Sequence, residues 1–318
     1  MRDKAVFITR CDIGWYSKNA NVYRKSLEVA TKYDATLYAS RECRVPDEIA
    51  RRYSRIVRFD KVLDVLSCVQ GLAAGTQVFT GFDFPCMYVA WRLKRRYGCP
   101  WTVFLWDPPS LSHRDRFPPL RWAIDAVFRF FAKRCDRLVL NIHPGLLDEI
   151  GYRPREGQLE QRMQDAWDGV DFNRIERMKE IGFEYDFGVL AEWSRAKGGE
   201  LLAEGLKRMP GKRCLWIGDP PKDGTSRDGI EFFGRLPQDE AFKRLRKCRI
   251  LVVPYLATRA FKWNYPLKIF EYLQLGRPIL ASDNPGNVAV AKRYDGRIML
   301  FKSGDVADLV EKTLEIKE

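Results

Sequence analysis

The stretch "NYPLKIFEYLQLGRPILAS", residues 264–282, decides how the second half of the chain is organised. Pro266 suits the first position of a helix, because its missing N–H would have no partner there. Gly276 suits the end of that helix, where a residue past the last turn often needs a positive φ. Pro278 then forbids continuation. The stretch therefore predicts a helix, a tight turn and a buried strand at 279–281.

The start of this helix is a candidate anion site. With Pro266 first, the backbone N–H groups of Leu267 and Lys268 point outward from the positive end of the helix dipole, where phosphate commonly binds. Glu271 follows about 7.5 Å along the axis, too far to contact that phosphate but suited to accept hydrogen bonds from the hydroxyl pair of a ribose. The alternative is an ordinary amphipathic helix with a solvated Lys268–Glu271 pair, worth a few tenths of a kcal/mol.

The rest of the chain has the same alternation of strands and helices. Apolar runs alternate with amphipathic segments through the first half, turn polar at 151–170, and resume afterwards. Because strands separated by helices form parallel sheets, the pattern predicts an α/β protein with doubly wound, Rossmann-like domains. We expect an N-terminal domain at 1–165 and a C-terminal domain at 166–318, facing a cleft. Ligands of such sheets bind beyond the carboxyl ends of the strands.

Composition and motifs exclude several classes. The eight cysteines contain no C-x-x-C and only two histidines are present, so zinc and thioredoxin-like sites are disfavoured and a reducing, cytoplasmic location is expected. No G-x-G-x-x-G follows a strand, and no Walker A sequence occurs. The charged N-terminus does not resemble a signal peptide. Glycine, glutamine and proline interrupt the apolar run at 65–91, so we expect no membrane span there.

Positive charge is concentrated in one segment. The chain carries a formal net charge of +13, and residues 92–137 hold 11 Lys or Arg against 4 Asp, interleaved with aromatic residues. A basic, aromatic helix surface fits an anionic membrane face. Two alternatives stay open: the aromatic residues pack in the core while the arginines are merely solvated, or the segment binds nucleic acid, which is the least favoured.

Other stretches of the second half carry a resemblance when they are taken in order with the opening one. "DGVD" (168–171) comes first, then a strand that contains Gly188, then Arg195 and Lys197, and then "IEFFGRLP" (230–237). In this order they resemble the glycosyltransferases of family 4 (glycosyl transferases group 1), whose fold is called GT-B. The resemblance extends over the second domain, and in the first domain it rests mainly on spacing.

The resemblance implies a hexosyltransferase-type glycosyltransferase. It would move a sugar from a nucleoside-diphosphate sugar to a glycan or lipid-linked acceptor, with retention of configuration. Charge develops on the β-phosphate during transfer and must be stabilised by a metal or by fixed positive groups. No D-x-D pair occurs in the sequence, and basic side chains with the N–H groups of the helix could supply the charge, so no metal or cofactor is expected.

The resemblance and the residue types together give a set of candidate residues. We expect catalytic roles for Arg195, Lys197 and Asp107. The first domain would bind the acceptor, and the second domain would bind the nucleotide sugar. The expected donor-binding residues are Gly14, Glu271, Lys268, Leu267, Asn264, Tyr265, Leu236 and His143.

Several positions depart from the family pattern. Trp263 stands where the family often places a first glutamate, and the glycine pair of its first domain is reduced to Gly14. Asp107 binds an acceptor hydroxyl or acts as a base, or it caps a helix. His143 lines the cleft or packs in the interior. These departures leave two alternatives: a degenerate, non-catalytic glycosyltransferase that binds lipid or polyanion, and a nucleotide-sugar epimerase. The donor base, the sugar and the acceptor are not specified by these residues.

Overall fold

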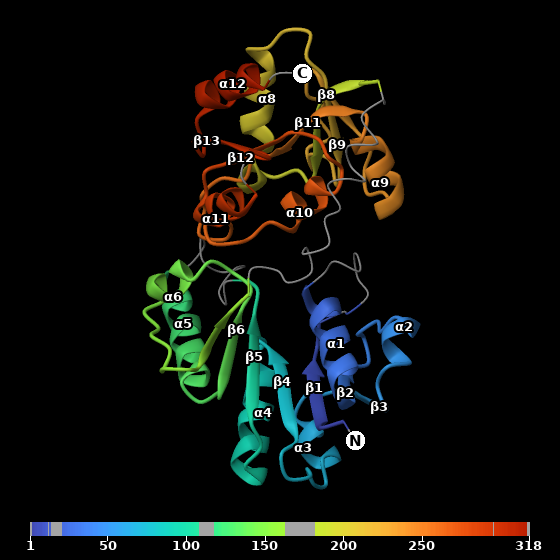
Figure 1. Ribbon diagram of the computed structural model, residues 1–318, viewed down its shortest axis with the longest axis vertical. Helices are drawn as coiled ribbons and strands as arrows, with labels where there is room; N and C mark the ends of the chain where they lie inside the picture. Colours follow the sequence, from blue (N-terminus) through green and yellow to red (C-terminus); the bar gives the residue numbers. More distant parts are fainter. Residues whose placement is uncertain are drawn as a thin grey trace. The chain divides into compact units, whose positions relative to one another are not determined.

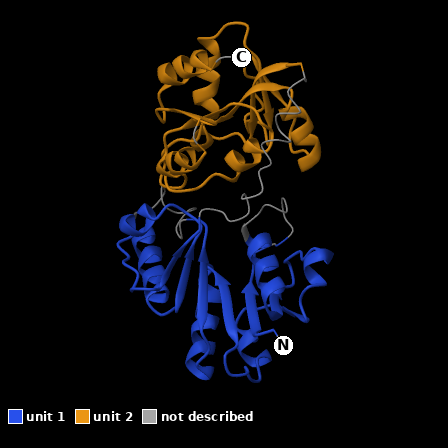
Figure 2. Cartoon of the chain, viewed as in Figure 1, with its two compact units in different colours: residues 1–163 blue, residues 164–318 orange. Residues whose placement is uncertain are grey.

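The computed structural model describes residues 2–11, 13, 21–107, 118–162, 182–294 and 296–316. Residue contacts divide the chain into two compact units, Met1–Met163 and Gln164–Glu318 (Figure 2). Each unit has its own parallel β-sheet with helices packed on it (Figure 1). The α/β class and the doubly wound, Rossmann-like form of both halves are therefore confirmed.

The first unit is built on a seven-stranded sheet of order β3-β2-β1-β4-β5-β6-β7. All neighbouring strands pair in parallel. The order reverses between β1 and β4, which is the switch point where ligands of such sheets bind. In chain order the elements are β1 Lys4–Thr9, α1 Asn21–Lys32, β2 Asp34–Ser40, α2 Asp47–Ala50, β3 Arg55–Phe59, α3 Asp64–Cys68, β4 Gln77–Gly81, α4 Phe84–Tyr97, β5 Trp101–Leu105, α5 Pro118–Ala132, β6 Arg137–Leu140, α6 Gly145–Glu149 and β7 Leu159–Gln161.

The second unit repeats the arrangement on a six-stranded sheet of order β10-β9-β8-β11-β12-β13, again parallel throughout. Its switch point lies between β8 and β11. In chain order the elements are β8 Tyr185–Leu190, η2 Arg195–Lys197, α8 Gly199–Lys207, β9 Cys214–Ile217, β10 Ile230–Phe232, α9 Gln238–Leu245, β11 Cys248–Val253, α10 Leu267–Leu273, β12 Ile279–Ser282, α11 Pro285–Arg293, β13 Ile298–Phe301 and α12 Val306–Glu315.

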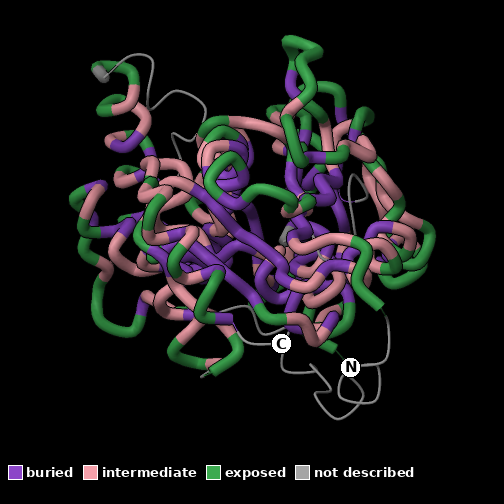
Figure 3. Tube along the Cα trace, turned by 90° about the horizontal axis from the view of Figure 1, so that it is seen from above, coloured by how far each residue is buried: buried purple, intermediate pink, exposed green. Residues whose placement is uncertain are grey.

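The central strands are the most buried parts of both units (Figure 3). All five residues of β5 and all four of β9 are buried. Such continuous apolar strands follow from helices that cover both faces of a parallel sheet. Within the described ranges, no helix combines the length and the apolar character that crossing a bilayer requires.

Several elements differ from the sequence expectation. The polar segment at 151–170 contains an edge strand, β7, which pairs only with β6 and so needs few apolar residues. Neither α11 nor β13 was anticipated from the sequence. Helix α11 begins with Pro-Gly-Asn, which is a typical turn sequence. The helix expected at 61–71 is only five residues long, Asp64–Cys68, and an extended segment follows it.

Candidate functional site

The candidate residues of the second unit gather at one edge of its sheet. The loop after β8 carries Arg195 and Lys197, the loop after β10 carries Leu236, and the loop after β11 leads through Asn264 and Tyr265 into α10. Since every strand pair in this sheet is parallel, the carboxyl ends of all these strands lie at the same edge. The loops after β8 and β11 also flank the switch point, where a crevice is expected in this fold.

Helix α10 begins and ends close to its expected limits. Pro266 is the N-cap, with φ −64° and ψ 120°, and Leu267 and Lys268 occupy the first helical positions. The expected place of Pro266 inside the helix is therefore wrong by one residue. The helix has seven residues and ends at Leu273, and Gly276 follows with φ +67°. A positive φ at this position is the conformation that the sequence predicts for a glycine there.

Glu271 is buried, with 2% of its surface exposed. Lys268 Nζ lies 2.9 Å from Glu271 Oε2, and Gln238 donates a hydrogen bond of 3.4 Å to Glu271 Oε1. A buried carboxylate is costly unless charge and hydrogen bonds compensate it. The alternative of a solvated Lys268–Glu271 pair is therefore wrong, because the acid lies inside the unit. Gln238, at the first position of α9, was missed by the sequence analysis.

The loop after β8 is pressed against the end of β11 at the switch point. Gly198 has φ +76°, and a Cβ built there would lie 1.9 Å from the carbonyl oxygen of Pro254, the residue that follows β11. Ser194 caps the short helix η2 by accepting a hydrogen bond from the N–H of Lys197. Only glycine fits between these two loops. The backbone position of Arg195 and Lys197 is thus fixed by Gly198 on one side and by Ser194 on the other.

The two basic residues of this loop have different surroundings. Arg195 is exposed. Lys197 Nζ lies 2.9 Å from Glu192 Oε1 and 6.0 Å from the centre of the Phe261 ring. Glu192 was not singled out from the sequence. It neutralises Lys197 in this structure, so an incoming phosphate would have to compete with it.

Helix α10 is joined to the end of β8 by a hydrogen bond. The N–H of Leu190, the last residue of β8, donates to the hydroxyl of Tyr272 at 2.7 Å. Tyr272 is 1% exposed, and burial raises its pKa well above the usual value for tyrosine. Its hydroxyl therefore stays protonated at neutral pH. The residue next to Glu271 in α10 thus contacts the strand that leads to Arg195 and Lys197.

The segment before α10 packs against the start of α11. A Cβ built on Gly286 would lie 1.9 Å from the carbonyl oxygen of Asn264. Ser282 and Asn284 both donate hydrogen bonds to the carbonyl oxygen of Tyr255, at 2.6 and 3.0 Å. These contacts fix the long loop after β11. Asn264 and Trp263 are half-buried in it, and Tyr265 is 4% exposed.

Leu236 is half-buried in the loop after β10, and a cluster of aromatic side chains is formed by Trp193, Trp216 and Phe232. The ring centre of Trp193 lies 4.8 Å from that of Trp216 and 5.4 Å from that of Phe232. Gly218 and Gly234 form an antiparallel bridge, and Arg235 donates to Asp219, which lowers the pKa of that carboxyl. Trp193 was not identified from the sequence, because a single tryptophan after a strand carries no recognisable pattern.

In the first unit, Asp107 and His143 follow the neighbouring strands β5 and β6. Both are half-buried at the carboxyl edge of the sheet. The N–H of Gly145 donates to His143 Nδ1 at 3.1 Å, and burial lowers the pKa of the imidazole. His143 is therefore neutral near pH 7, with its proton on Nε2. Gly14 and the "DGVD" stretch at 168–171 lie outside the described residues.

The basic segment forms part of an exposed surface on α4 and α5, which pack together. Phe128 and Phe131 are buried, as the core alternative requires, but Trp122 is 70% exposed and Phe130 is 41% exposed. Arg134 stacks 3.5 Å from the centre of the Phe130 ring. We call the following exposed side chains the α4–α5 surface: Leu120, Trp122, Val127, Phe130, Arg92, Arg95, Arg96, Lys133 and Arg134.

The described part of the chain contains no group of three or more His, Cys, Asp or Glu side chains placed to hold a metal ion. The expectation of a metal-independent reaction stays a prediction. One edge of the second sheet therefore carries the carboxylate of Glu271 in α10 and the cationic side chains of Arg195 and Lys197 after β8. The backbone N–H groups at the start of α10 lie at the same edge. Such a set can bind a ligand that carries both an anion and neighbouring hydroxyl groups.

Comparison with known proteins gives a consistent result. Residues 186–318 match the family described as Glycosyl transferases group 1. No curated protein matches the sequence. The fold is similar to that of sucrose-phosphate synthase from Thermosynechococcus elongatus, with a TM-score of 0.68 and 13% identity over 99% of this chain and 90% of that one. It is also similar to Anabaena HepE in complex with UDP, with a TM-score of 0.70 and 11% identity over 98% of this chain and 89% of that one.

A third similar structure is the α,α-trehalose 6-phosphate synthase from Burkholderia multivorans. It has a TM-score of 0.62 and 10% identity, over 99% of this chain and 88% of that one. At these identities the likeness concerns the fold alone. The shared fold is the GT-B fold, with two Rossmann-like domains, that the sequence predicted.

Proposed function

We propose that the chain transfers a sugar from a nucleoside-diphosphate sugar to a glycan or lipid-linked acceptor, a proposal supported by the match of residues 186–318 to the glycosyl transferases group 1. The observation that carries the proposal is the buried carboxylate of Glu271, held by Lys268 and Gln238 at the carboxyl edge of the second sheet. A fixed carboxylate at this position favours a ligand with paired hydroxyl groups, and a ribose has that form.

The proposed roles follow from the chemistry of the leaving group. Sugar transfer releases a nucleoside diphosphate, so negative charge grows on the β-phosphate as the bond breaks. Arg195, Lys197 and the N–H groups of Leu267 and Lys268 would stabilise it. Each charge-assisted hydrogen bond contributes about 1.5–3 kcal/mol. Transfer would proceed without a metal and with retention of configuration. Asn264, Tyr265 and Leu236 would contact the rest of the donor.

The first unit would supply the acceptor side. Asp107 is proposed to bind or deprotonate the acceptor hydroxyl. The neutral His143 is proposed to bind the sugar donor, by donating a hydrogen bond to it through Nε2. Gly14, which lies outside the described residues, is proposed to contact the donor.

We further propose that the α4–α5 surface binds an anionic membrane face. It combines exposed apolar side chains (Leu120, Trp122, Val127 and Phe130) with five exposed cations, and neither α4 nor α5 carries an exposed acid. An apolar stripe with flanking cations is typical of helices that lie in a lipid interface. This arrangement would place the enzyme on the cytoplasmic face of a membrane, where a lipid-linked acceptor is found.

The decisive experiment measures thermal stability with UDP, GDP and ADP in parallel. UDP comes first, because a structure of similar fold was solved with UDP. A ligand at about 100 times its Kd adds roughly 2.7 kcal/mol, which raises Tm by several degrees. We expect one nucleotide to stabilise the wild type and Glu271→Gln to lose the response.

The matched control is Glu204→Gln, an acid of the same unit that pairs with Lys207 on the surface. It should respond to the nucleotide as the wild type does. If no nucleotide stabilises the wild type, the proposed donor site is wrong. If a nucleotide binds but its sugar derivative is neither transferred nor hydrolysed, the chain is a binding module instead.

A further inference from the structure

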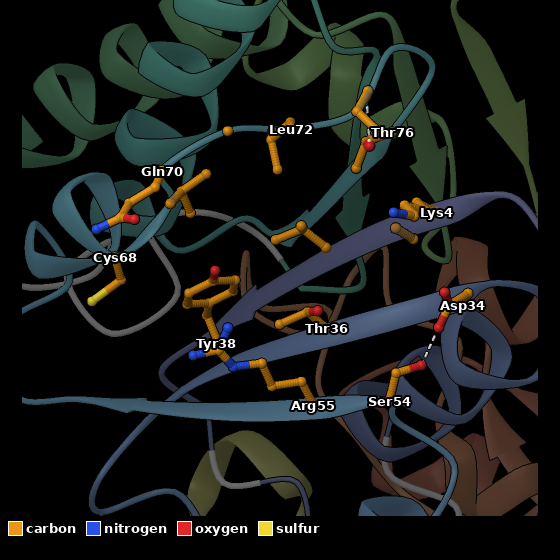
Figure 4. Close-up of a pocket in the computed structure, with 15 residues that line it drawn as sticks. Lys4, Asp34, Thr36, Tyr38, Ser54, Arg55, Cys68, Gln70, Leu72 and Thr76 are labelled. Atoms are coloured by element: carbon orange, nitrogen blue, oxygen red, sulfur yellow. Dashed lines mark hydrogen bonds between the residues drawn. The ribbon is translucent and has the colours of Figure 1, made fainter.

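The two faces of strand β2 differ in chemistry. Ala35, Leu37 and Ala39 point to one face, are fully buried, and belong to the core cluster that includes residues of α1. Asp34, Thr36 and Tyr38 point to the other face, where they line a pocket of about 600 Å³ (Figure 4). In a doubly wound sheet both faces are normally apolar because helices cover them. A polar inner face therefore calls for a separate explanation.

The pocket lies under residues 69–76, which follow the short helix α3 and are not helical. Helix α3 stops at Cys68, and the chain continues as an extended segment to Thr76, which passes over the sheet (Figure 4). Tyr97 of α4 holds the start of this segment by donating a 2.9 Å hydrogen bond to the carbonyl of Val69. Within the segment, the Thr76 hydroxyl donates a hydrogen bond of 2.7 Å to the carbonyl of Ala73. The cover thus has a defined position and leaves space beneath it.

The polar groups that line the pocket favour an anion, and Lys4, Asp34 and Arg55 among them are exposed residues. Lys4 and Arg55 contribute two cations, and the carboxylate of Asp34 is already bound by the hydroxyl of Ser54. Tyr38 is only 6% exposed and its ring lies beside the Arg55 side chain (Figure 4). Among the described residues, no protein group makes a hydrogen bond or ion pair with the side chains of Tyr38, Arg55 or Lys4.

Tyr38 acts as a donor in this pocket. Burial raises the pKa of its hydroxyl, and the positive charge of Arg55 only partly offsets the effect. The hydroxyl is therefore protonated at neutral pH and aimed at the pocket with no protein acceptor in the described ranges. This hydroxyl is not among the buried polar atoms that lack a partner in the described residues, so solvent reaches it. A ligand oxygen would take the place of that water as the acceptor.

The pocket is separate from the proposed reaction site of the same unit. Lys4, Asp34 and Arg55 are the first residues of β1, β2 and β3, so the pocket lies at the amino end of the sheet. Asp107 and His143 follow β5 and β6 at the carboxyl end. Substrates of this fold bind at the carboxyl end, so a ligand in this pocket would not be one of the reacting molecules.

We propose that this pocket binds a small phosphorylated sugar as an effector. Arg55 and Lys4 would hold the phosphate, since an arginine fork and a lysine ammonium are the usual protein partners of that group. The Tyr38 hydroxyl would donate to a ligand oxygen, and Thr36 and Gln70 would bind sugar hydroxyls. The volume lies in the range of pockets that enclose small molecules.

The test uses the full chain and glucose 6-phosphate as the probe, with glucose and inorganic phosphate as parallel arms. Calorimetry should show binding of glucose 6-phosphate, and Arg55→Ala should weaken it by about tenfold or more, the loss expected for a charge-assisted contact. Tyr38→Phe keeps the ring volume and should weaken binding by a smaller factor. Arg51→Ala, which removes an exposed arginine outside the pocket, should leave binding unchanged.

A local readout comes from two exposed cysteines of the same unit. Cys68 lines the pocket, whereas Cys11 follows β1 at the opposite end of the sheet. Glucose 6-phosphate should slow the alkylation of Cys68 by iodoacetamide and leave Cys11 unaffected, as mass spectrometry would report. Protection of Cys11 alone, binding that Arg55→Ala does not weaken, or equal affinity for inorganic phosphate would each overturn the proposal. None of these results depends on whether a nucleotide binds the second unit.

Discussion

The two units have the same parallel α/β fold but differ in where their characteristic charged residues lie. The second unit buries its distinctive acid, Glu271, and balances it with Lys268 and Gln238. The first unit carries its distinctive cations on the outside of α4 and α5, next to the exposed Trp122 and Phe130. Buried charge serves recognition of a small ligand in a fixed geometry, whereas exposed charge suits a broad, anionic surface. The following predictions test this contrast, starting with the largest effect.

The first prediction concerns the fixed geometry of the second unit. Gly198→Ala places a Cβ 1.9 Å from the Pro254 carbonyl oxygen, at a φ of +76°. Because the backbone itself must move, we expect a loss of at least about 3 kcal/mol of stability. Urea denaturation followed by circular dichroism measures it. Gly224→Ala is the control, because it has a φ of +67° but open space around it, and should cost about 1–2 kcal/mol. Equal losses would show that the loop contact is not rigid.

The second prediction concerns Glu28, a partly buried acid of the first unit. Burial alone would raise the pKa of Glu28, but the charges of Lys25 and Arg162 outweigh it and lower the value to about 2. Glu28 therefore stabilises the folded chain above its usual pKa, and this contribution is lost as pH falls from about 4.5 to about 2, a total of about 3 kcal/mol.

Urea unfolding of wild type and Glu28→Gln over this pH range checks the prediction. The difference in unfolding free energy should be largest near neutral pH and shrink as pH falls. Glu42→Gln, an exposed acid of the same unit, should show a small and pH-independent difference. A constant difference for Glu28→Gln would mean that its charge does not stabilise the fold.

The third prediction concerns the exposed surface. Trp122→Ser should reduce binding to vesicles that contain anionic lipid by about tenfold, because a tryptophan that enters the interface buries a large apolar area. Co-sedimentation at low and high salt measures it. Leu314, 72% exposed in the second unit, gives the matched control Leu314→Ser. If the wild type does not bind such vesicles at low salt, the α4–α5 surface has another role.

The sequence predicted the elements and the edge at which the candidate residues gather, but not their partners. Strand–helix alternation and the pair Pro266 and Gly276 are local signals, so α10 and its surroundings were recognisable. Gln238 reaches Glu271 only through folding, since 33 positions separate them. Tyr272 was missed for the same reason, because 82 positions separate it from Leu190. A contact between distant residues has no periodic signature in one sequence.

The pocket under the extended segment shows a different limit. Strand β2 reads "DATLYAS", and its alternation of polar and apolar residues is typical of a sheet with one solvated face. The sequence does not reveal that a segment from 69 to 76 covers that face without filling it. Such a space depends on where α3 ends, and helix ends are set by tertiary packing as much as by local residues.

The hydrogen bond from Leu190 to Tyr272 has a consequence for the timing of ligand capture. It joins α10 to the end of β8, and Gly198 joins the following loop to the end of β11. The acid in α10 and the bases after β8 are thus parts of one stiff body, already ordered before any ligand arrives. Binding of a nucleotide there would order little additional chain, so the loss of conformational entropy would be small. Its association rate would depend on how often it meets the site in the right orientation, and not on a loop that must first open.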